Sequence, residues 1–243
     1  MIKDTVKLAN KGKVQMVAHR GLSAIETENT AAAFIAAANR SYYGIETDIH
    51  RTADGKFVCL HDDHTKRVAK EVVTTGDNTY DRLAQVQLYD TAKGMGARRD
   101  LVPPMLEDYI SICKAYGKHS VLELKDQFTI DELKTIIKIL DKADHLQDTT
   151  FITFYPQNLF KIRSLLPEQS CQALTDRMND IIFNGVIQHK LDIDILHTVL
   201  DKRLVDRLKE NGIKINAWTV DDPKDAERLI SLGVDFITTN IFE

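Results

Sequence analysis

Short β-branched runs alternate with amphipathic helical patterns along almost the whole of this 243-residue chain. Strands that are joined through helices run parallel, and about eight such units predict an α/β fold, a closed (β/α)8 TIM barrel. A doubly wound open sheet is the alternative. The expected strands are Val14–Ala18, Ile45–Ile49, Ser120–Leu124, Phe151–Phe154, Cys171–Leu174, Leu191–Leu196, Lys214–Trp218 and Asp235–Thr238. The expected helices are Thr30–Asn39, Met105–Tyr116, Ile130–Lys142, Pro156–Leu166, Asp201–Asn211 and Pro223–Leu232.

We expect residues 1–243 to form a single domain, because barrels of this kind commonly use about 250 residues as one unit. The stretch around residues 51–104 interrupts the alternation with a short extra strand, Phe57–Leu60, and a long segment rich in Thr, Asp and Gly. Long excursions in compact domains are usually lids or binding loops. This pattern predicts a small insertion after the second strand, packed over the catalytic end of the barrel. The segment Met178–Gln188 is ambiguous, since Gly185 argues against a regular helix.

Composition limits the class of partner. The net charge of −4 disfavours a nucleic-acid binder, which usually carries a basic patch, so no nucleic-acid partner is expected. No apolar stretch is long enough for an integral membrane segment, and the polar start does not resemble a secretory signal. Three cysteines (Cys59, Cys113, Cys171) lack metal-ligand spacing and are expected to be reduced thiols of a cytoplasmic protein. The oligomeric state is not readable from these features.

Carboxylates cluster at the ends of two expected strands. Glu46 and Asp48 alternate along one strand and therefore share a face, and Glu123 with Lys125 repeats this spacing on the next one. Three carboxylates at one barrel mouth would repel each other unless a divalent cation neutralised them. We therefore predict a metal site of Glu46, Asp48 and Glu123 that binds Mg²⁺ or Ca²⁺ through hard oxygen ligands. A single pair of this kind is more often a solvated strand end.

Two histidines and an arginine accompany these acids. His19 and Arg20 follow the first strand, and His61 follows the extra one. Histidine transfers protons near neutral pH, and arginine can clamp two phosphate oxygens. Arg20 has a structural alternative, an ion pair with Glu46 or Glu123.

Two further residues near the expected mouth leave alternatives open. Phe154 ends the fourth strand and either lines the pocket or caps the core. For Asn29, the N-cap of the following helix is preferred over a direct catalytic role.

In their order along the chain, these residues resemble the glycerophosphodiester phosphodiesterase family, and the likeness covers nearly all of the sequence. The shared motifs are His19-Arg20-Gly21, Glu28-Asn29-Thr30, Phe34, Gly44-Ile45-Glu46-Thr47-Asp48, Asp54-Gly55, His61-Asp62, Arg67, Pro104 with Leu106-Glu107, Glu123-Leu124-Lys125, Trp218-Thr219 and Asp235-Phe236-Ile237-Thr238-Thr239-Asn240. The chain departs from the family pattern at Thr27, where proline is common, and at Met105, where threonine is more usual.

The resemblance implies cleavage of glycerophosphodiesters, such as glycerophosphocholine or glycerophosphoethanolamine, to glycerol 3-phosphate and an alcohol. By position it implies Glu46, Asp48 and Glu123 as metal ligands and His19 and His61 as the acid–base pair. It also implies Arg20 and Lys125 as phosphate contacts and Trp218 as an aromatic near the substrate. Two alternatives stay open. A lysophospholipase D-type activity would need an apolar groove, and the insertion is not conspicuously hydrophobic; a non-catalytic phosphate-binding barrel would need lost polar positions.

Overall fold

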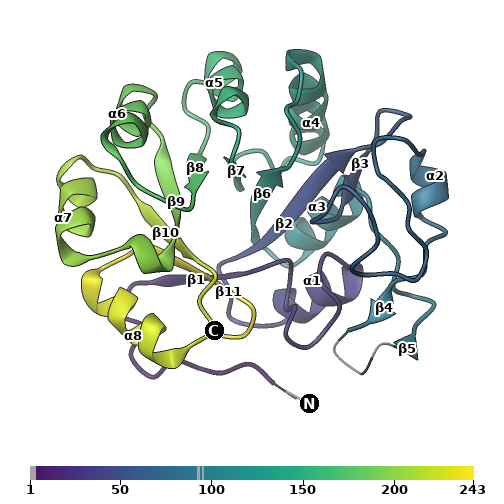
Figure 1. Ribbon diagram of the computed structural model, residues 1–243, viewed down its shortest axis with the longest axis horizontal. Helices are drawn as coiled ribbons and strands as arrows, with labels where there is room; N and C mark the ends of the chain where they lie inside the picture. Colours follow the sequence, from purple (N-terminus) through teal and green to yellow (C-terminus); the bar gives the residue numbers. More distant parts are fainter. Residues whose placement is uncertain (1–3, 92–93, 95) are drawn as a thin grey trace.

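Eight parallel strands close into a barrel in the computed structural model, which describes residues 4–91, 94 and 96–243 (Figure 1). The ring is β1-β11-β10-β9-β8-β7-β6-β2, and β1 also pairs with β2. This closure confirms the (β/α)8 prediction and excludes the open sheet. The barrel strands are β1 (Gln15–Ala18), β2 (Gly44–Arg51), β6 (His119–Leu124), β7 (Thr149–Thr153), β8 (Cys171–Thr175), β9 (Asp192–Leu196), β10 (Ile215–Trp218) and β11 (Phe236–Thr239).

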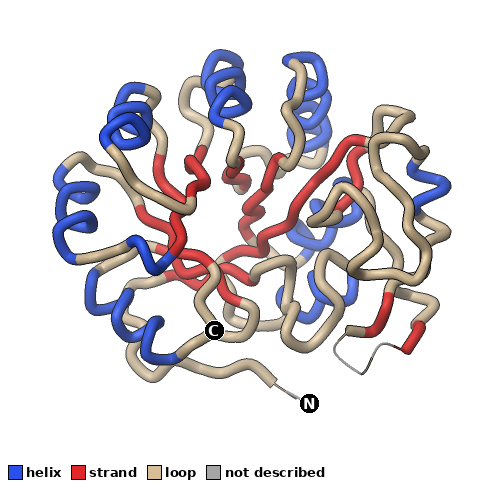
Figure 2. The backbone as a smooth tube through the Cα atoms, in the orientation of Figure 1, coloured by secondary structure: helices blue, strands red, loops and turns tan. Residues whose placement is uncertain are grey.

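Helices surround the strands on the outside (Figure 2). Side-chain caps fix where several of them begin: Asp201 and Asp222 accept hydrogen bonds from backbone N–H groups of the first turns of α7 and α8. Gly233 ends α8 at φ 84°, a conformation that favours glycine. The helices around the barrel are α1 (Ala31–Ala38), α3 (Leu106–Ala115), α4 (Ile130–Lys142), α5 (Pro156–Leu165), α6 (Asp180–Gln188), α7 (Lys202–Glu210) and α8 (Pro223–Leu232), with a short 3₁₀ turn at His197–Val199. None of the described helices is long and apolar enough to cross a membrane.

The ambiguous segment forms a regular helix, α6, with Gly185 inside it. The argument from Gly185 against a helix was therefore wrong. Asn179 caps the helix by accepting a hydrogen bond from the Ile182 N–H, and Phe183 and Val186 are buried against the core. Tertiary packing of an apolar face outweighs the cost of one glycine, about 1 kcal/mol relative to alanine.

Gly185→Ala is accordingly expected to raise the free energy of unfolding by about 0.5–1 kcal/mol. A Cβ at this position would meet no atom within 4 Å. Gly212 offers the matched control, because its Cβ would also have open space but its φ is 72°. Gly212→Ala should therefore destabilise the protein. Urea unfolding of both variants would check the pair, and a loss of stability in Gly185→Ala would contradict the prediction.

The insertion forms a small unit with its own apolar core. β3 (Phe57–Cys59) pairs antiparallel with β2, and the chain continues through α2 (Tyr80–Leu83) and the hairpin β4 (Tyr89–Asp90) and β5 (Gly96–Ala97). The buried residues of this apolar core are Val58, Leu60, Val68, Ala69, Val73, Leu83, Val86, Leu88 and Leu101.

This unit lies beside the barrel near α1 (Figure 1), so the expectation that it packs over the catalytic end was wrong for most of its length. The antiparallel turn from β2 into β3 directs the chain outward, and the apolar groups bury one another there. Among the predicted site residues, the insertion contributes only His61 to the mouth.

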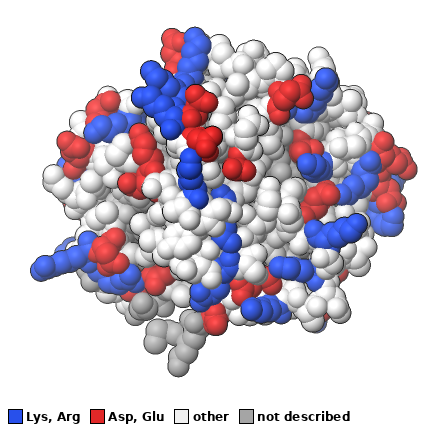
Figure 3. All heavy atoms as spheres, turned by 180° about the vertical axis from the view of Figure 1, so that it is seen from behind, with Lys and Arg blue, Asp and Glu red and all other residues white. Residues whose placement is uncertain are grey.

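Basic and acidic side chains lie close together on the face opposite that of Figure 1 (Figure 3). A surface of mixed sign creates a weaker long-range field than one of a single sign. Among the described residues, no large patch of a single sign stands out on this face.

Candidate active site

The predicted polar residues converge on one cavity of about 90 Å³ at the carboxyl ends of the strands. Eight of the nine predicted site residues line it: His19, Arg20, Glu46, His61, Glu123, Lys125, Phe154 and Trp218. The ninth, Asp48, is fully buried beside Arg20 and Lys125. Active sites of TIM barrels are found at this end of the barrel.

Three buried carboxylates form an acidic wall, of which Glu46 and Glu123 line the cavity and Asp48 lies beside them. Glu46, Asp48 and Glu123 each offer an oxygen atom, and these atoms lie within 4.8 Å of one another. Alternation along β2 directs Glu46 and Asp48 to one face, and Asp48 lies directly beside Glu123 in the pairing of β2 with β6. Asp48 Oδ1 is buried and has no hydrogen-bond partner among the described residues. Closely spaced hard oxygen donors, one of them without a hydrogen bond in the described part of the chain, fit a divalent cation.

The pKa values of the three carboxyls in this wall depend on their burial and on the charges around them. Burial, together with the Asp48 charge, raises the pKa of Glu46 well above its ordinary value and that of Glu123 to about 8. Burial opposes ionisation of Asp48 as well, but the charges of Arg20 and Lys125 outweigh it and lower the pKa of this carboxyl. Without metal, the surroundings therefore favour the protonated forms of Glu46 and Glu123 and the ionised form of Asp48.

Two cations face the acidic wall. Lys125 Nζ lies 2.9 Å from Glu123 Oε1 and 3.5 Å from Asp48 Oδ1. Arg20 Nη1 donates to Glu28 Oε1 at 2.9 Å, and Nε lies 3.3 Å from Asp48 Oδ2. From the sequence, Glu46 or Glu123 was considered as the ion-pair partner of Arg20. In the structure the partners of its side chain are Glu28 and Asp48. Only the Arg20 backbone N–H bonds to Glu46, at 2.7 Å.

A tight turn holds Arg20 at the rim of the cavity. Arg20 and Gly21 have φ of 55° and 78°, both in the left-handed region. A Cβ on residue 21 would lie 2.6 Å from the Ala33 carbonyl carbon, so only glycine fits against α1 there.

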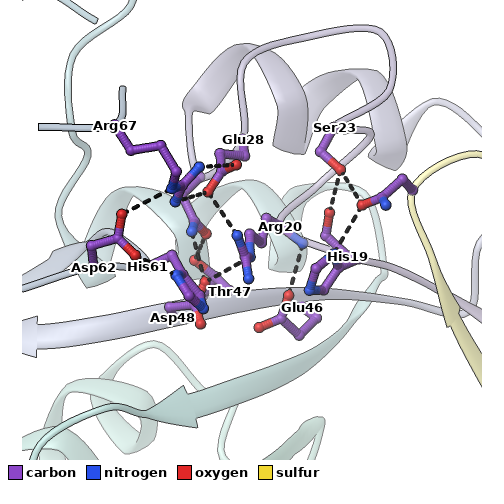
Figure 4. A network of polar contacts seen from close by, with 12 residues as sticks. His19, Arg20, Ser23, Glu28, Glu46, Thr47, Asp48, His61, Asp62 and Arg67 are labelled. Carbon is purple, nitrogen blue, oxygen red and sulfur yellow. Dashed lines mark hydrogen bonds and ion pairs between the residues drawn. The ribbon is translucent and has the colours of Figure 1, made fainter. Parts of the chain in front are cut away.

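His61 belongs to a network of polar contacts that connects it to Arg20 (Figure 4). Its Nδ1 lies 2.7 Å from Asp62 Oδ1, and Arg67 Nε donates to the other oxygen of Asp62 at 2.9 Å. Arg67 also donates two hydrogen bonds, of 2.7 and 2.8 Å, to the Glu28 carboxylate. The insertion and the loop after β1 are thereby joined, and the two site residues His61 and Arg20 share one rigid network.

His19 is oriented from the far end of the chain. Its Nδ1 lies 2.9 Å from Asn240 Oδ1, and Asn240 Nδ2 donates to the carboxylate of Asp221. A carboxylate only accepts, so this contact fixes the amide with its oxygen toward His19. His19 then carries its proton on Nδ1 and leaves Nε2 free to accept another. Burial, and next the Arg20 charge, lower the pKa of His19 to about 4.

Two supporting residues were missed or misread in the sequence. Asn29 is not the N-cap of α1, because Thr30 fills that position; instead, Asn29 Nδ2 donates to Asp48 Oδ2 at 2.8 Å. His50 was given no role, yet it lies between Asp126 and the His61 carbonyl at 2.9 and 3.1 Å. The alternation Glu46, Asp48, His50 along β2 was a signal that could have revealed it.

Two aromatic rings form the remaining rim. Phe154 and Trp218 meet edge to face with their centroids 5.9 Å apart. Phe154 is 46% exposed, so it does not cap the core and instead lines the cavity. Of the two positions considered for Phe154 from the sequence, the structure therefore shows the one that lines the pocket.

Comparison with known proteins decides the family. The family model described as "Glycerophosphoryl diester phosphodiesterase family" matches residues 19–243. The chain belongs to this family. As a member it is a phosphoric diester hydrolase that acts on glycerophosphodiesters, and the earlier resemblance is confirmed.

Relatives from several bacteria support the assignment. The glycerophosphodiester phosphodiesterase family member YhdW of Bacillus subtilis (strain 168) is 29% identical, with 93% of each chain covered. A glycerophosphodiester phosphodiesterase of Caldanaerobacter subterraneus subsp. tengcongensis is 26% identical, with 94% of each chain covered. A solved phosphodiesterase of Oleispira antarctica, in complex with the product sn-glycerol-3-phosphate, superposes with a TM-score of 0.85 at 24% identity and covers 93% of this chain and 92% of its own. That structural likeness shows the shared barrel fold.

Proposed function

We propose that this enzyme hydrolyses glycerophosphodiesters, such as glycerophosphocholine or glycerophosphoethanolamine, to glycerol 3-phosphate and an alcohol. Glu46, Asp48 and Glu123 would hold a divalent cation, Mg²⁺ or Ca²⁺, and His19 and His61 would transfer protons. The observation that carries this proposal is the meeting of three buried carboxylates, two cations and two histidines at one cavity, which all of them except Asp48 line. The product named for the Oleispira antarctica neighbour is the one expected here.

The cation, when bound, would polarise the phosphoryl group and lower the pKa of an attacking oxygen. Arg20 and Lys125 would contact the non-bridging phosphate oxygens and stabilise the charge that develops on them. This requires Arg20 to exchange part of its contact with Asp48 for the substrate.

The surroundings of the two histidines suggest different roles. His19 is neutral at neutral pH and presents a free Nε2, which suits a general base that takes the proton of the attacking oxygen. Burial lowers the pKa of His61 as well, but the carboxylates of Asp48 and Asp62 oppose this effect and favour its protonated form. His61 would therefore protonate the leaving alkoxide. The attacking oxygen is either a water or the glycerol 2-hydroxyl of the substrate.

The basic test is release of glycerol 3-phosphate from glycerophosphocholine by the purified protein. Chelation should abolish turnover, and added Mg²⁺ or Ca²⁺ should restore it. Metal binding without turnover on a panel of phosphodiesters would instead favour the non-catalytic barrel.

Cation binding should release protons and weaken as the pH falls. In the metal-free protein Glu123 has a pKa of about 8, above its ordinary value of 4.5, and Glu46 is raised too. Both must ionise to bind a cation, so affinity should rise with pH up to about 8. The unfolded chain ionises these groups first, so the stability of the metal-free protein should fall as the pH rises from about 4.5 to 8. Calorimetry in buffers of different ionisation enthalpy would count the protons, and pH-independent affinity between 6 and 8 would contradict the prediction.

An apolar groove favours a second candidate, lysophospholipase D-type activity on lipid phosphodiesters. The groove, of about 600 Å³, runs between α5 and α6 and is continuous with the cavity, since Phe154 and Leu174 line both. Ile181, on its edge, is 84% exposed. The apolar surface that was sought in the insertion thus lies on the opposite side of the mouth.

Turnover of lysophosphatidylcholine, compared with that of glycerophosphocholine, would separate the two candidates. Gly185 lines the groove and is remote from the polar cavity, so Gly185→Phe would narrow the groove alone. If the acyl chain binds in the groove, this variant should lose activity on the lysolipid and keep activity on glycerophosphocholine. Absence of lysolipid turnover in the unaltered enzyme would eliminate the second candidate.

A further inference from the structure

Asp194 lines the catalytic cavity, yet the proposed chemistry does not use it. It lies on β9 and is only 2% exposed, and its Oδ1 has no hydrogen-bond partner within the described part of the chain. Its register partner on β10, Asn216, is already engaged with Gln172 and Thr238. A buried polar atom without a partner destabilises the fold, so structural needs do not explain Asp194.

A second buried polar atom without a hydrogen bond to any described residue belongs to another residue of the same cavity, Trp218. The indole Nε1 of Trp218 is buried and lacks a partner among the described residues. An indole N–H only donates, whereas a protonated carboxyl both donates and accepts. Together they present the complement of an alcohol hydroxyl, which accepts one hydrogen bond and donates another.

The position of Asp194 indicates which hydroxyl reaches it. In the ring of eight strands β9 is four strands from β2 in either direction, so Asp194 faces the Glu46 and Asp48 wall from across the barrel. The phosphate is expected at that wall, beside Arg20 and Lys125. The glycerol 2-hydroxyl lies near the phosphorus, and the terminal hydroxyl is the one that extends farthest from it.

The charge of Asp194 is compatible with binding of the glycerol end of the substrate beside it. Burial raises the pKa of Asp194 to about 8, so the side chain is neutral at neutral pH. A neutral carboxyl does not repel the anionic phosphodiester.

We propose that Asp194, assisted by the Trp218 indole, is a specificity residue that binds the terminal hydroxyl of the glycerol end of the substrate. This inference rests on the proposed function. It would explain the presence of a buried acid in the barrel whose Oδ1 has no hydrogen-bond partner among the described residues.

The proposed role of Asp194 can be tested with two chromogenic diesters that differ by one oxygen atom. 2,3-Dihydroxypropyl 4-nitrophenyl phosphate has the terminal hydroxyl, and 2-hydroxypropyl 4-nitrophenyl phosphate lacks only that group. We expect the unaltered enzyme to prefer the first in kcat/KM by about 10–100-fold, the range for a lost hydrogen bond that leaves a buried partner unpaired. Asp194→Leu should reduce this preference to about threefold or less by slowing the first substrate alone, and Trp218→Phe should reduce it in part.

The melting temperature distinguishes a binding role of Asp194 from a structural one, because only a structural role predicts that replacing Asp194 lowers it. Asp194→Leu removes a buried unpaired carboxyl, so the variant should unfold at a temperature equal to or higher than the parent. Asp194→Asn keeps hydrogen-bonding capacity and should retain most of the preference.

Equal losses on both diesters, or an unaltered enzyme without preference, would overturn the inference and leave the proposed function standing. A lowered melting temperature of Asp194→Leu with unchanged preference would also overturn it. Absence of turnover on both diesters and on glycerophosphocholine would remove the proposed function itself.

Discussion

Replacing Glu46 with glutamine is expected to lower kcat/KM for glycerophosphocholine by about 10³-fold or more, because a bound cation contributes several kcal/mol to transition-state stabilisation. Glutamine keeps the carbonyl oxygen that accepts from the Arg20 N–H, so the turn after β1 should survive. What it loses is one of the three charges that the cation needs. Titration with Mg²⁺ or Ca²⁺ should show weakened binding in parallel with the lost activity.

The metal-free variant should be at least as stable as the parent, since it no longer buries a carboxyl whose pKa is raised by burial and by Asp48. Glu168→Gln is the matched control: this exposed residue lies between α5 and β8, at the end of the barrel away from the mouth, and should have normal activity. Full activity in Glu46→Gln would refute the metal-site assignment.

Replacing His61 with alanine is expected to cost about 10²–10⁴-fold in kcat with glycerophosphocholine, the usual contribution of general acid–base catalysis. The loss should shrink greatly with a 4-nitrophenyl diester, because 4-nitrophenolate departs without a proton. His19→Ala should lose a similar factor with either substrate, since the attacking oxygen must give up its proton in both. The ratio of the two losses therefore assigns the acid and the base.

His64 provides a control within the same segment, three residues beyond His61, with a side chain 39% exposed. His64→Ala should retain activity on both substrates. If the 4-nitrophenyl diester rescued His19→Ala instead of His61→Ala, the two roles would have to be exchanged.

Local patterns in the sequence predicted the parts of the site that depend on one strand at a time. Alternation along β2 placed Glu46 and Asp48 on one face, and the repeated βα pattern placed their strand ends at one mouth. These features follow from backbone geometry alone.

Contacts between distant segments were not predictable in this way. The Arg67–Glu28 pair joins residues 39 positions apart, and its formation depends on how the insertion packs against α1. Asp194 lies in an ordinary apolar strand pattern, and its isolation becomes visible only when Asn216 is seen to bond elsewhere. Such features depend on which side chains remain unpaired after packing, which a one-dimensional pattern does not encode.

The separation of 221 positions between His19 and Asn240 also bears on how the enzyme matures. During synthesis all three carboxylates of the acidic wall are present in the chain once residue 123 has been added, more than a hundred residues before β11. A nascent chain therefore contains the proposed cation ligands long before Asn240, which orients His19, has been added. Under the proposed mechanism, chains that lack the final strand should be inert toward diesters.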